Sequence, residues 1–186
     1  MNYPFLNSKI NNEENINNYK NRGLSFESMI NDSNEYYLKN NIALIYKRPT
    51  PIKIISMSKD NSFISKAVFE KQSTTDYNGV YKGHYIDFEA KSTKSKTSFP
   101  LNNIKDHQLV HLNNVINNNG IAFFLIYFSS FDEVYLVKAS DIINLIETKN
   151  AKSIKLELIK KIGFPINKTT NILVDYLENI EKMFNF

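Results

Sequence analysis

The sequence has no cysteine and no tryptophan among its 186 residues, and only five glycines and five prolines. Without cysteine there is no disulfide framework and no thiolate ligand for a metal, which fits a reducing compartment. No apolar run approaches the ~20 residues of a membrane-spanning helix. The longest run, residues 121–128, has the length of a strand, and residues 1–20 lack the apolar core of a secretion signal. We therefore expect no signal peptide and no membrane partner.

The chain has the length of one domain, and its 42% of hydrophobic residues is enough to bury a core. The net charge of +4 permits nucleic-acid binding but does not indicate it by itself. Residues 1–20 are rich in asparagine and poor in apolar side chains, which predicts a disordered or loosely attached arm. With only Lys9 and Lys20 as cations, we read this arm as a plain tail rather than a DNA-binding one. We expect residues 21–186 to form a single domain.

Hydrophobic spacing and turn signals predict an α/β fold, in which helices flank a mixed central β-sheet. The predicted strands are residues 42–47, 85–91, 121–128 and 133–138, and the predicted helices are residues 22–39, 103–117, 140–148, 153–161 and 174–184. The unbroken apolar run 121–128 is typical of a strand buried on both faces. Tyr77-Asn78-Gly79 and Lys82-Gly83 are read as turns.

Residues 52–70 are predicted to form a β-hairpin that interrupts the core elements. Two strand-like runs flank the turn signal Lys59-Asp60-Asn61. A lone two-stranded hairpin is marginally stable in water. We therefore expect this hairpin to rest on something else, such as a partner subunit or DNA.

The most informative residues are Asp76, Glu89 and Lys91. Side chains at positions i and i+2 of a strand lie on the same face, so Glu89 and Lys91 project together. Ile86, Phe88 and Ala90 project to the opposite face, into the core. Many metal-dependent nucleases carry one acid, then a stretch as long as a short hairpin, and then the pattern acid-x-Lys on a strand. The alternative is a solvated stripe of charges, which is common on exposed strands.

Phosphodiester hydrolysis needs a hydroxide near neutral pH, neutralisation of the charge that grows on the phosphate, and protonation of the leaving oxygen. Mg²⁺ supplies the first two and prefers hard oxygen ligands. Asp76 and Glu89 would provide carboxylates, and the Ala90 carbonyl would provide a third oxygen. Lys91, a compact cation, would face the attacking water or a phosphoryl oxygen and stabilise the transition state.

Three nearby side chains have more than one reading. Asp87 shares the face of Glu89 and could ligate a second ion, but we favour a salt-bridge partner or a carboxylate hydrated at the end of the strand. Glu27, on the first helix, either completes the shell of the ion through water or is an exposed helical glutamate. The amide oxygen of Gln108 could bind the ion or its water, although from the residues alone Gln108 reads as a surface residue. His107 has no paired ligand spacing, so no zinc site is expected.

Polar and basic side chains flank the proposed site on both sides and are predicted to contact DNA phosphates. The group before Asp76 contains Lys71, Gln72, Ser73 and Thr75, the group after Lys91 contains Lys94 and Lys96, and further candidates for backbone contacts are Lys47, Arg48 and Lys59. The alternative readings of the two groups are a polar turn and a solvated loop.

Taken together, these motifs resemble the RecU family of Holliday-junction resolvases, a branch of the PD-(D/E)xK nucleases. The resemblance runs from about residue 21 to the C-terminus and is weaker after residue 131. Its matching stretches are NRG (21–23) with Glu27, KRPTP (47–51), KQSTTDYNG (71–79), YKG (81–83), YIDFEAK (85–91), KTSFP (96–100) and DHQ (106–108). Thr75 stands where the name of the superfamily places a proline.

The resemblance implies a restriction-endonuclease-like fold and a homodimer with a protruding hairpin stalk at about residues 52–70. It implies Mg²⁺-dependent cutting of four-way DNA junctions by paired symmetric nicks, with Mn²⁺ as a substitute ion. The ion would be held by Thr74, Asp76, Glu89 and Gln108, and Lys91 would stabilise the transition state. Arg22 and Lys82, in the matching stretches, join the predicted DNA contacts. A recombinase is a candidate further partner, and the expected location is cytoplasmic, with the nucleoid.

Two other functions stay open from the sequence. One is a PD-(D/E)xK nuclease that acts on other DNA, such as plain duplex or flaps, and the hairpin would discriminate it from a junction enzyme. The other is a non-catalytic DNA-binding protein that modulates recombination, and the presence of Asp76, Glu89 and Lys91 argues against it. The sequence therefore predicts a junction-resolving endonuclease of recombination and repair.

Overall fold

The computed structural model describes residues 25–71, 73–149, 151–169 and 172–186. The helices are α1 (Phe26–Lys39), α2 (Asp106–Asn117), α3 (Ala139–Lys149), α4 (Leu156–Ile162) and α5 (Leu177–Phe184), with a 3-10 turn at Leu101–Asn103. The strands are β1 (Leu44–Lys47), β2 (Ile52–Met57), β3 (Ile64–Phe69), β4 (Tyr77–Tyr81), β5 (His84–Thr93), β6 (Ser98–Pro100), β7 (Ile121–Phe128), β8 (Glu133–Lys138), β9 (Ser153–Lys155) and β10 (Phe164–Pro165). The predicted arm at residues 1–20 lies outside the described residues. None of the described helices combines the length and the apolarity needed to cross a bilayer.

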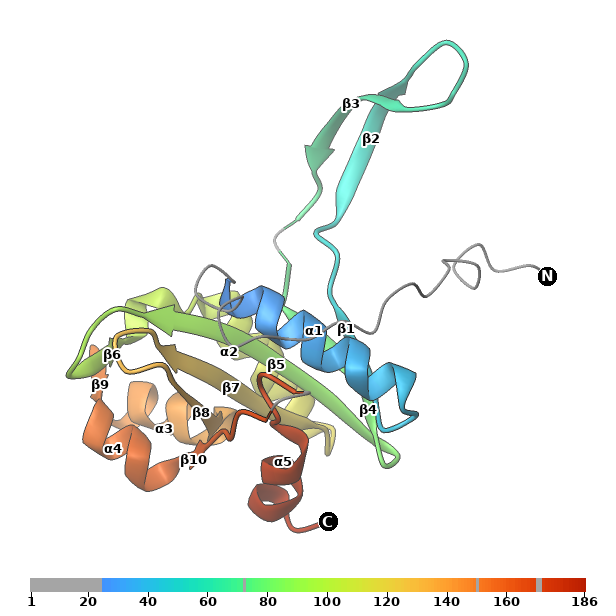
Figure 1. Ribbon diagram of the computed structural model, residues 1–186. Helices are drawn as coiled ribbons and strands as arrows, with labels where there is room; N and C mark the ends of the chain where they lie inside the picture. The colour runs from blue at the N-terminus through green and yellow to red at the C-terminus, as the bar shows by residue number, and fades with distance from the viewer. Residues whose placement is uncertain (1–24, 72, 150, 170–171) are drawn as a thin grey trace.

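Six strands form one mixed sheet in the order β1-β4-β5-β7-β8-β10 (Figure 1). β5 and β7 are parallel, and the other neighbours in this sheet are antiparallel. A parallel pair needs a crossover connection, which here includes β6 and α2. β7 is almost wholly buried, as an unbroken apolar run in a central strand requires. The predicted fold class, a mixed sheet flanked by helices, is confirmed.

Helices cover the two faces of the sheet and enclose a core on each. On one face α1 and α5 pack against β5 and β7, and Ile30, Phe88 and Ile180 belong to this core. On the other face α2, α3 and α4 pack against β7 and β8. The helices on this second face do not cover β1 and β4. The paired residues Leu44 and Val80, on these two strands, are both more than 40% exposed. One half of this face of the sheet is therefore open.

The predicted hairpin forms and projects from the body as a separate two-stranded sheet of β2 and β3 (Figure 1). Every residue of both strands is exposed, so no side chain of the hairpin is covered by the body. The exposed residues include large apolar ones, among them Ile54, Ile55 and Phe69. Exposed apolar surface of this kind is typical of a segment that contacts a partner.

Residues 77–79, which were predicted to form a turn, instead open strand β4, and that prediction is wrong. The strand pairs with β1 at this point, and a Cβ on Gly79 would lie 2.1 Å from the carbonyl oxygen of Leu44. Glycine is needed because the neighbouring backbone comes so close. The predicted turn at Lys82 and Gly83 is confirmed: their φ angles are 48° and 82°, as a two-residue type I′ hairpin requires.

The last two predicted helices begin later than expected. Residues 153–155 form β9, which pairs with β6, and α4 follows. Side chains of α1 hold the residues just before α5 against the body. Ser33 Oγ accepts from the Val174 N–H at 3.0 Å, and the Tyr37 hydroxyl donates to Asp175 Oδ1 at 2.8 Å.

Gly79→Ala is expected to destabilise the fold by about 1–3 kcal/mol, the usual range for overpacking a filled site. The added Cβ would meet backbone atoms of Leu44 and Ile45, and neither can rotate away. Urea unfolding followed by circular dichroism measures the change. The control is Thr97→Ala, at an exposed position, which should shift the free energy of unfolding by less than ~0.5 kcal/mol. Wild-type stability of Gly79→Ala would show that β1 and β4 are not packed as described.

Candidate active site

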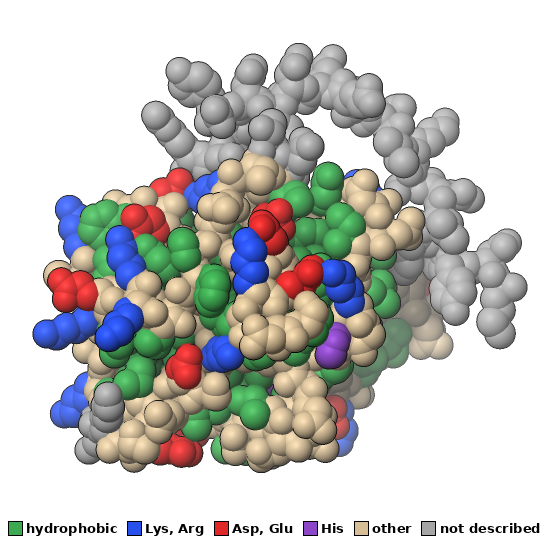
Figure 2. Space-filling model, turned by 90° about the horizontal axis from the view of Figure 1, so that it is seen from below, with side chains coloured by type: hydrophobic (Ala, Val, Ile, Leu, Met, Phe, Trp, Pro, Cys, Tyr) green, Lys and Arg blue, Asp and Glu red, His purple; other side chains and the backbone are tan. Residues whose placement is uncertain are grey.

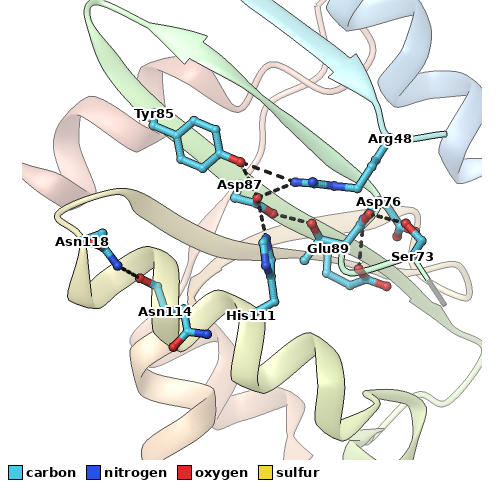
Figure 3. A network of polar contacts seen from close by, with 10 residues as sticks. Arg48, Ser73, Asp76, Tyr85, Asp87, Glu89, His111, Asn114 and Asn118 are labelled. Atoms are coloured by element: carbon cyan, nitrogen blue, oxygen red, sulfur yellow. Dashed lines mark hydrogen bonds and ion pairs between the residues drawn. The ribbon is translucent and has the colours of Figure 1, made fainter. Parts of the chain in front are cut away.

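Asp76, Glu89 and Lys91 come together at one face of the sheet (Figure 3 shows the two acids). Asp76 lies immediately before β4, while Glu89 and Lys91 alternate along β5. The Asp76 N–H donates to Glu89 Oε2 at 3.1 Å, and the Ala90 N–H donates to Asp76 Oδ2 at 3.0 Å. Lys91 Nζ lies 2.6 Å from Glu89 Oε1. These bonds hold the two carboxylates close to each other, with one ammonium group beside them.

Glu89 is a buried carboxylate, only 1% exposed. Burial and the nearby Asp76 carboxylate raise the pKa of Glu89 to about 7, while Lys91 acts in the opposite direction. A buried charge needs a partner to offset its desolvation. When both acids are ionised, Lys91 compensates only one of them, so the cluster is left with a negative charge that favours a bound cation.

Gln108 reaches this cluster from α2 and is buried, so reading it as a surface residue is wrong. Its Nε2 donates to Glu89 Oε1 at 2.6 Å, and its Oε1 accepts from the Lys105 N–H at 3.0 Å. The amide oxygen therefore caps the start of α2 in this structure. Gln108 would have to turn its amide over to bind an ion through oxygen, and this role stays a prediction.

The residues present fit a hard divalent cation. Thr74 Oγ1 is buried without a hydrogen-bond partner, which costs ~1–3 kcal/mol unless something else binds it. No group of three or more His, Cys, Asp or Glu side chains in the described part of the chain could hold a metal. An ion between Asp76 and Glu89 would thus also need hydroxyl, amide or backbone oxygens and water. Mg²⁺ suits such a site, because it binds one or two carboxylates and keeps several waters.

Asp87, also on β5, lies beside this cluster in a network of polar contacts (Figure 3). Its Oδ2 lies 2.6 Å from Arg48 Nη2, 2.8 Å from the Tyr85 hydroxyl and 2.8 Å from His111 Nε2. Its Oδ1 accepts a hydrogen bond from the Thr75 hydroxyl. The reading of Asp87 as a salt-bridge partner is confirmed. A carboxylate hydrated at the end of the strand is wrong, because Asp87 is 0% exposed.

Tyr85 and His111 were missed by the sequence analysis. The strand alternation that puts Glu89 beside Asp87 also puts Tyr85 on that face, so Tyr85 had a usable signal. His111 lies one helical turn after Gln108 and must face the same way. Its role had no signal in the sequence, because the direction in which Gln108 points depends on how α2 docks.

Glu27 forms an ion pair with Lys47 of β1. Both side chains are about half exposed, at 51% and 47%. This is close to the reading of Glu27 as an exposed helical glutamate. A contact from Glu27 to an ion through water stays a prediction.

The predicted DNA contacts lie on several segments. Lys71, Lys94 and Lys96 are exposed on the segments that precede Asp76 and follow Lys91 in the chain, and Lys59 is exposed at the tip of the hairpin. Ser73 is half-buried, and Lys82 lies in the β4–β5 turn, at the other end of these strands from Asp76. Arg22 and Gln72 lie outside the described residues. Thr75 is 1% exposed and its hydroxyl is bound to Asp87, so the prediction that it contacts DNA is wrong.

The hairpin joins the body between β1 and β4, next to Asp76. On the side of the body seen from below, away from the hairpin, basic and acidic side chains are interspersed (Figure 2). That face therefore offers mixed charge to a polyanion. The side that carries the hairpin and Asp76 is the better candidate for a DNA surface.

Comparison with known proteins gives one consistent family. The model of RecU, Recombination protein U, matches residues 21–182. The Holliday junction resolvase RecU of Streptococcus thermophilus is 47% identical over 169 residues, which cover 89% of this chain and 85% of the relative. RecU of Lactococcus lactis subsp. cremoris is 46% identical over 87% of this chain and 78% of the relative, and RecU of Bacillus thuringiensis is 46% identical over 89% and 86%.

Among solved structures, Archaeoglobus fulgidus Hjc, a Holliday junction resolvase from an archaeal hyperthermophile, aligns over 73% of this chain and 93% of its own. The TM-score is 0.41 and the sequence identity is 9%. The family assignment rests on the sequence matches, which span most of the chain. The resemblance inferred from the motifs is confirmed, and this chain belongs to the RecU family.

Proposed function

We propose that this protein is a Mg²⁺-dependent endonuclease that resolves four-way DNA junctions by paired symmetric nicks, in recombination and repair. The observation that carries the proposal is the cluster of Asp76, Glu89 and Lys91, together with the unpartnered hydroxyl of Thr74, two residues before Asp76 in the chain. Relatives whose sequences are 46–47% identical to this chain bear the name Holliday junction resolvase, and this name supports the choice of substrate.

Thr74, Asp76 and Glu89 would hold the ion, and Gln108 would join them if its amide turns. When bound, Mg²⁺ supplies a hydroxide near neutral pH and neutralises charge on the phosphate, and Mn²⁺ would substitute for it. Lys91 lies on the same strand face as Glu89 and presents its ammonium at the edge of the cluster, 18% exposed. It would stabilise the charge that develops on the phosphoryl oxygens. Gln108 orients Glu89 through their hydrogen bond.

Two copies of the site are needed to cut two equivalent strands, so we propose a homodimer. The open half of the sheet face supports this proposal, because the exposed side chains of Leu44, Tyr46 and Val80 lie there on β1 and β4. β1 is also the edge strand of the sheet, with a backbone side that no other described strand covers. An apolar edge of this kind is typical of a surface that pairs with another chain.

Removing either acid is expected to stop cutting while leaving junction binding intact. Asp76→Ala or Glu89→Ala takes away an oxygen ligand, so cleavage of a labelled four-way junction in Mg²⁺ should fall below detection. Lys91→Ala should lower the turnover rate by about 10²–10³-fold, as the loss of a group that stabilises transition-state charge does. Gel shifts without metal measure binding, and Glu147→Ala, an exposed acid on α3, is the control. A variant that cuts like wild type would remove that residue from the site.

Shortening the hairpin is expected to remove the preference for junctions. Ile54 pairs with Ala67, so an Asn-Gly turn can replace residues 55–66 and keep the base of the hairpin. We expect junction affinity to fall by about tenfold, or ~1.4 kcal/mol, and affinity for linear duplex to stay within twofold of wild type. Mn²⁺ binding to the body should not change. Equal losses for junction and duplex would favour a nuclease that acts on other DNA.

Leu44→Glu is expected to weaken self-association, because it places a charge on the apolar edge of the sheet. Sedimentation velocity over a concentration series should show a dimer for the wild type and a dissociation constant raised by at least about tenfold, or ~1.4 kcal/mol, for the variant. Phe131→Glu is the control, since Phe131 is similarly exposed but lies between β7 and β8. A monomeric wild type, or an effect of Phe131→Glu alone, would contradict this interface.

A further inference from the structure

Asp87 is fully buried, and four hydrogen-bonding groups contact its carboxylate. Three groups bind its Oδ2, and the Thr75 hydroxyl binds its Oδ1. An ionised carboxylate only accepts, and it offers about four lone-pair sites. His111 is therefore the donor through Nε2–H, the three contacts occupy Oδ2 fully, and the Thr75 hydroxyl occupies one side of Oδ1. Asp87 is poorly placed to be a ligand of a second ion.

The four partners of Asp87 come from separate parts of the chain, and Figure 3 labels three of them, Arg48, Tyr85 and His111. Arg48 follows β1, Thr75 precedes β4, Tyr85 lies at the start of β5, and His111 lies on α2. Asp87 is the one group that all four side chains contact. Its carboxylate thus ties the segment before β4 and the helix α2 to the middle of the sheet.

Two of these contacts bear directly on the proposed ion site. Thr75 stands between Thr74 and Asp76, the two residues that would bind the ion from this segment. Arg48 also binds the segment through its backbone, because its N–H donates to the Asp76 carbonyl oxygen at 2.7 Å. The side-chain and backbone bonds together set where the Thr74 hydroxyl and the Asp76 carboxylate lie relative to β5.

The contact between His111 and Asp87 lies next to the contact between Gln108 and Glu89 and has the same form. On α2, Gln108 and His111 are three residues apart and face the same side. On β5, Asp87 and Glu89 are two residues apart and face the same side. Gln108 binds Glu89 and His111 binds Asp87, so two parallel contacts fix α2 against the site.

We propose that Asp87 is a positioning residue of the ion site: through Thr75, Arg48 and His111 it holds Thr74, Asp76 and Glu89 in place for the divalent cation, and it does not ligate the cation itself. The inference rests on the proposed function, since it concerns the same site. Residues that hold metal ligands in place usually change metal affinity by about 10–100-fold when they are mutated.

The first test uses Thr75→Val, which keeps the shape of the side chain and removes the hydroxyl that binds Asp87. Mn²⁺ binding to the full-length protein, measured by isothermal titration calorimetry, should weaken by about tenfold or more. Metal-free binding to a four-way junction should stay within twofold of wild type. Thr75→Ser restores a hydroxyl and should recover Mn²⁺ affinity, and Thr97→Val, at an exposed position, should have no effect.

Wild-type Mn²⁺ affinity in Thr75→Val would overturn the inference, and so would a Thr75→Ser variant that is as weak as Thr75→Val. A purely structural role would lower the unfolding temperature of Thr75→Val without changing Mn²⁺ affinity well below that temperature. If the wild-type protein itself binds no Mn²⁺ and leaves junctions uncut, the proposed function fails instead, and the two failures are distinguishable.

Asp87→Asn separates a positioning residue from a ligand. A positioning residue predicts unchanged Mn²⁺ stoichiometry with weaker binding, because the same ion is held less well. A ligand of a second ion predicts the loss of one binding event with the affinity of the other unchanged, and that result would overturn the inference. The Thr75 variants keep the test decisive if Asp87→Asn does not fold.

Discussion

The site depends on a reciprocal pair of hydrogen bonds between the residue before β4 and the middle of β5. The N–H of Asp76 binds the Glu89 carboxylate, and the N–H of Ala90 binds the Asp76 carboxylate. Two acids that would repel each other are thereby held together where water has little access. The burial and the repulsion both raise the pKa of Glu89, and a cation bound between the acids would offset both effects.

The uneven cover of the sheet shows how the proposed site could be buried and still be reached by a large substrate. On one face, α2, α3 and α4 cover β7 and β8, while β1 and β4 are left open. Glu89 and Asp87 lie at the boundary, so α2 supports them from one side through Gln108 and His111. Asp76 and the base of the hairpin lie on the other side. In the proposed enzyme, rigid support and access for DNA would therefore be divided between the two halves of one face.

The sequence predicted best where a signal is local and repeated. The bounds of β7 and β8, the hairpin at residues 52–70 and the shared face of Glu89 and Lys91 follow from apolar runs, turn residues and strand alternation. Gly79 was misread because the need for glycine comes from β1, a strand 34 residues earlier at Ile45, and not from a turn.

Non-local packing set the rest of the site and left no comparable signal. The hydroxyl of Thr75 looked available for DNA, yet it points to a carboxylate twelve residues away. Gln108 looked like a surface residue, because its burial follows only from the docking of α2 against β5. Asp87 could be predicted to pair with a cation, but its partners on α2 and before β4 could not be named from the sequence.

Anomalous diffraction from crystals grown or soaked with Mn²⁺ tests the central claim most directly, because it locates the ion without relying on cleavage. The account predicts a peak between the carboxylates of Asp76 and Glu89, in contact with the Thr74 hydroxyl, and none on Asp87. A fully occupied ion bound elsewhere, with Asp76 and Glu89 left without metal, would contradict it.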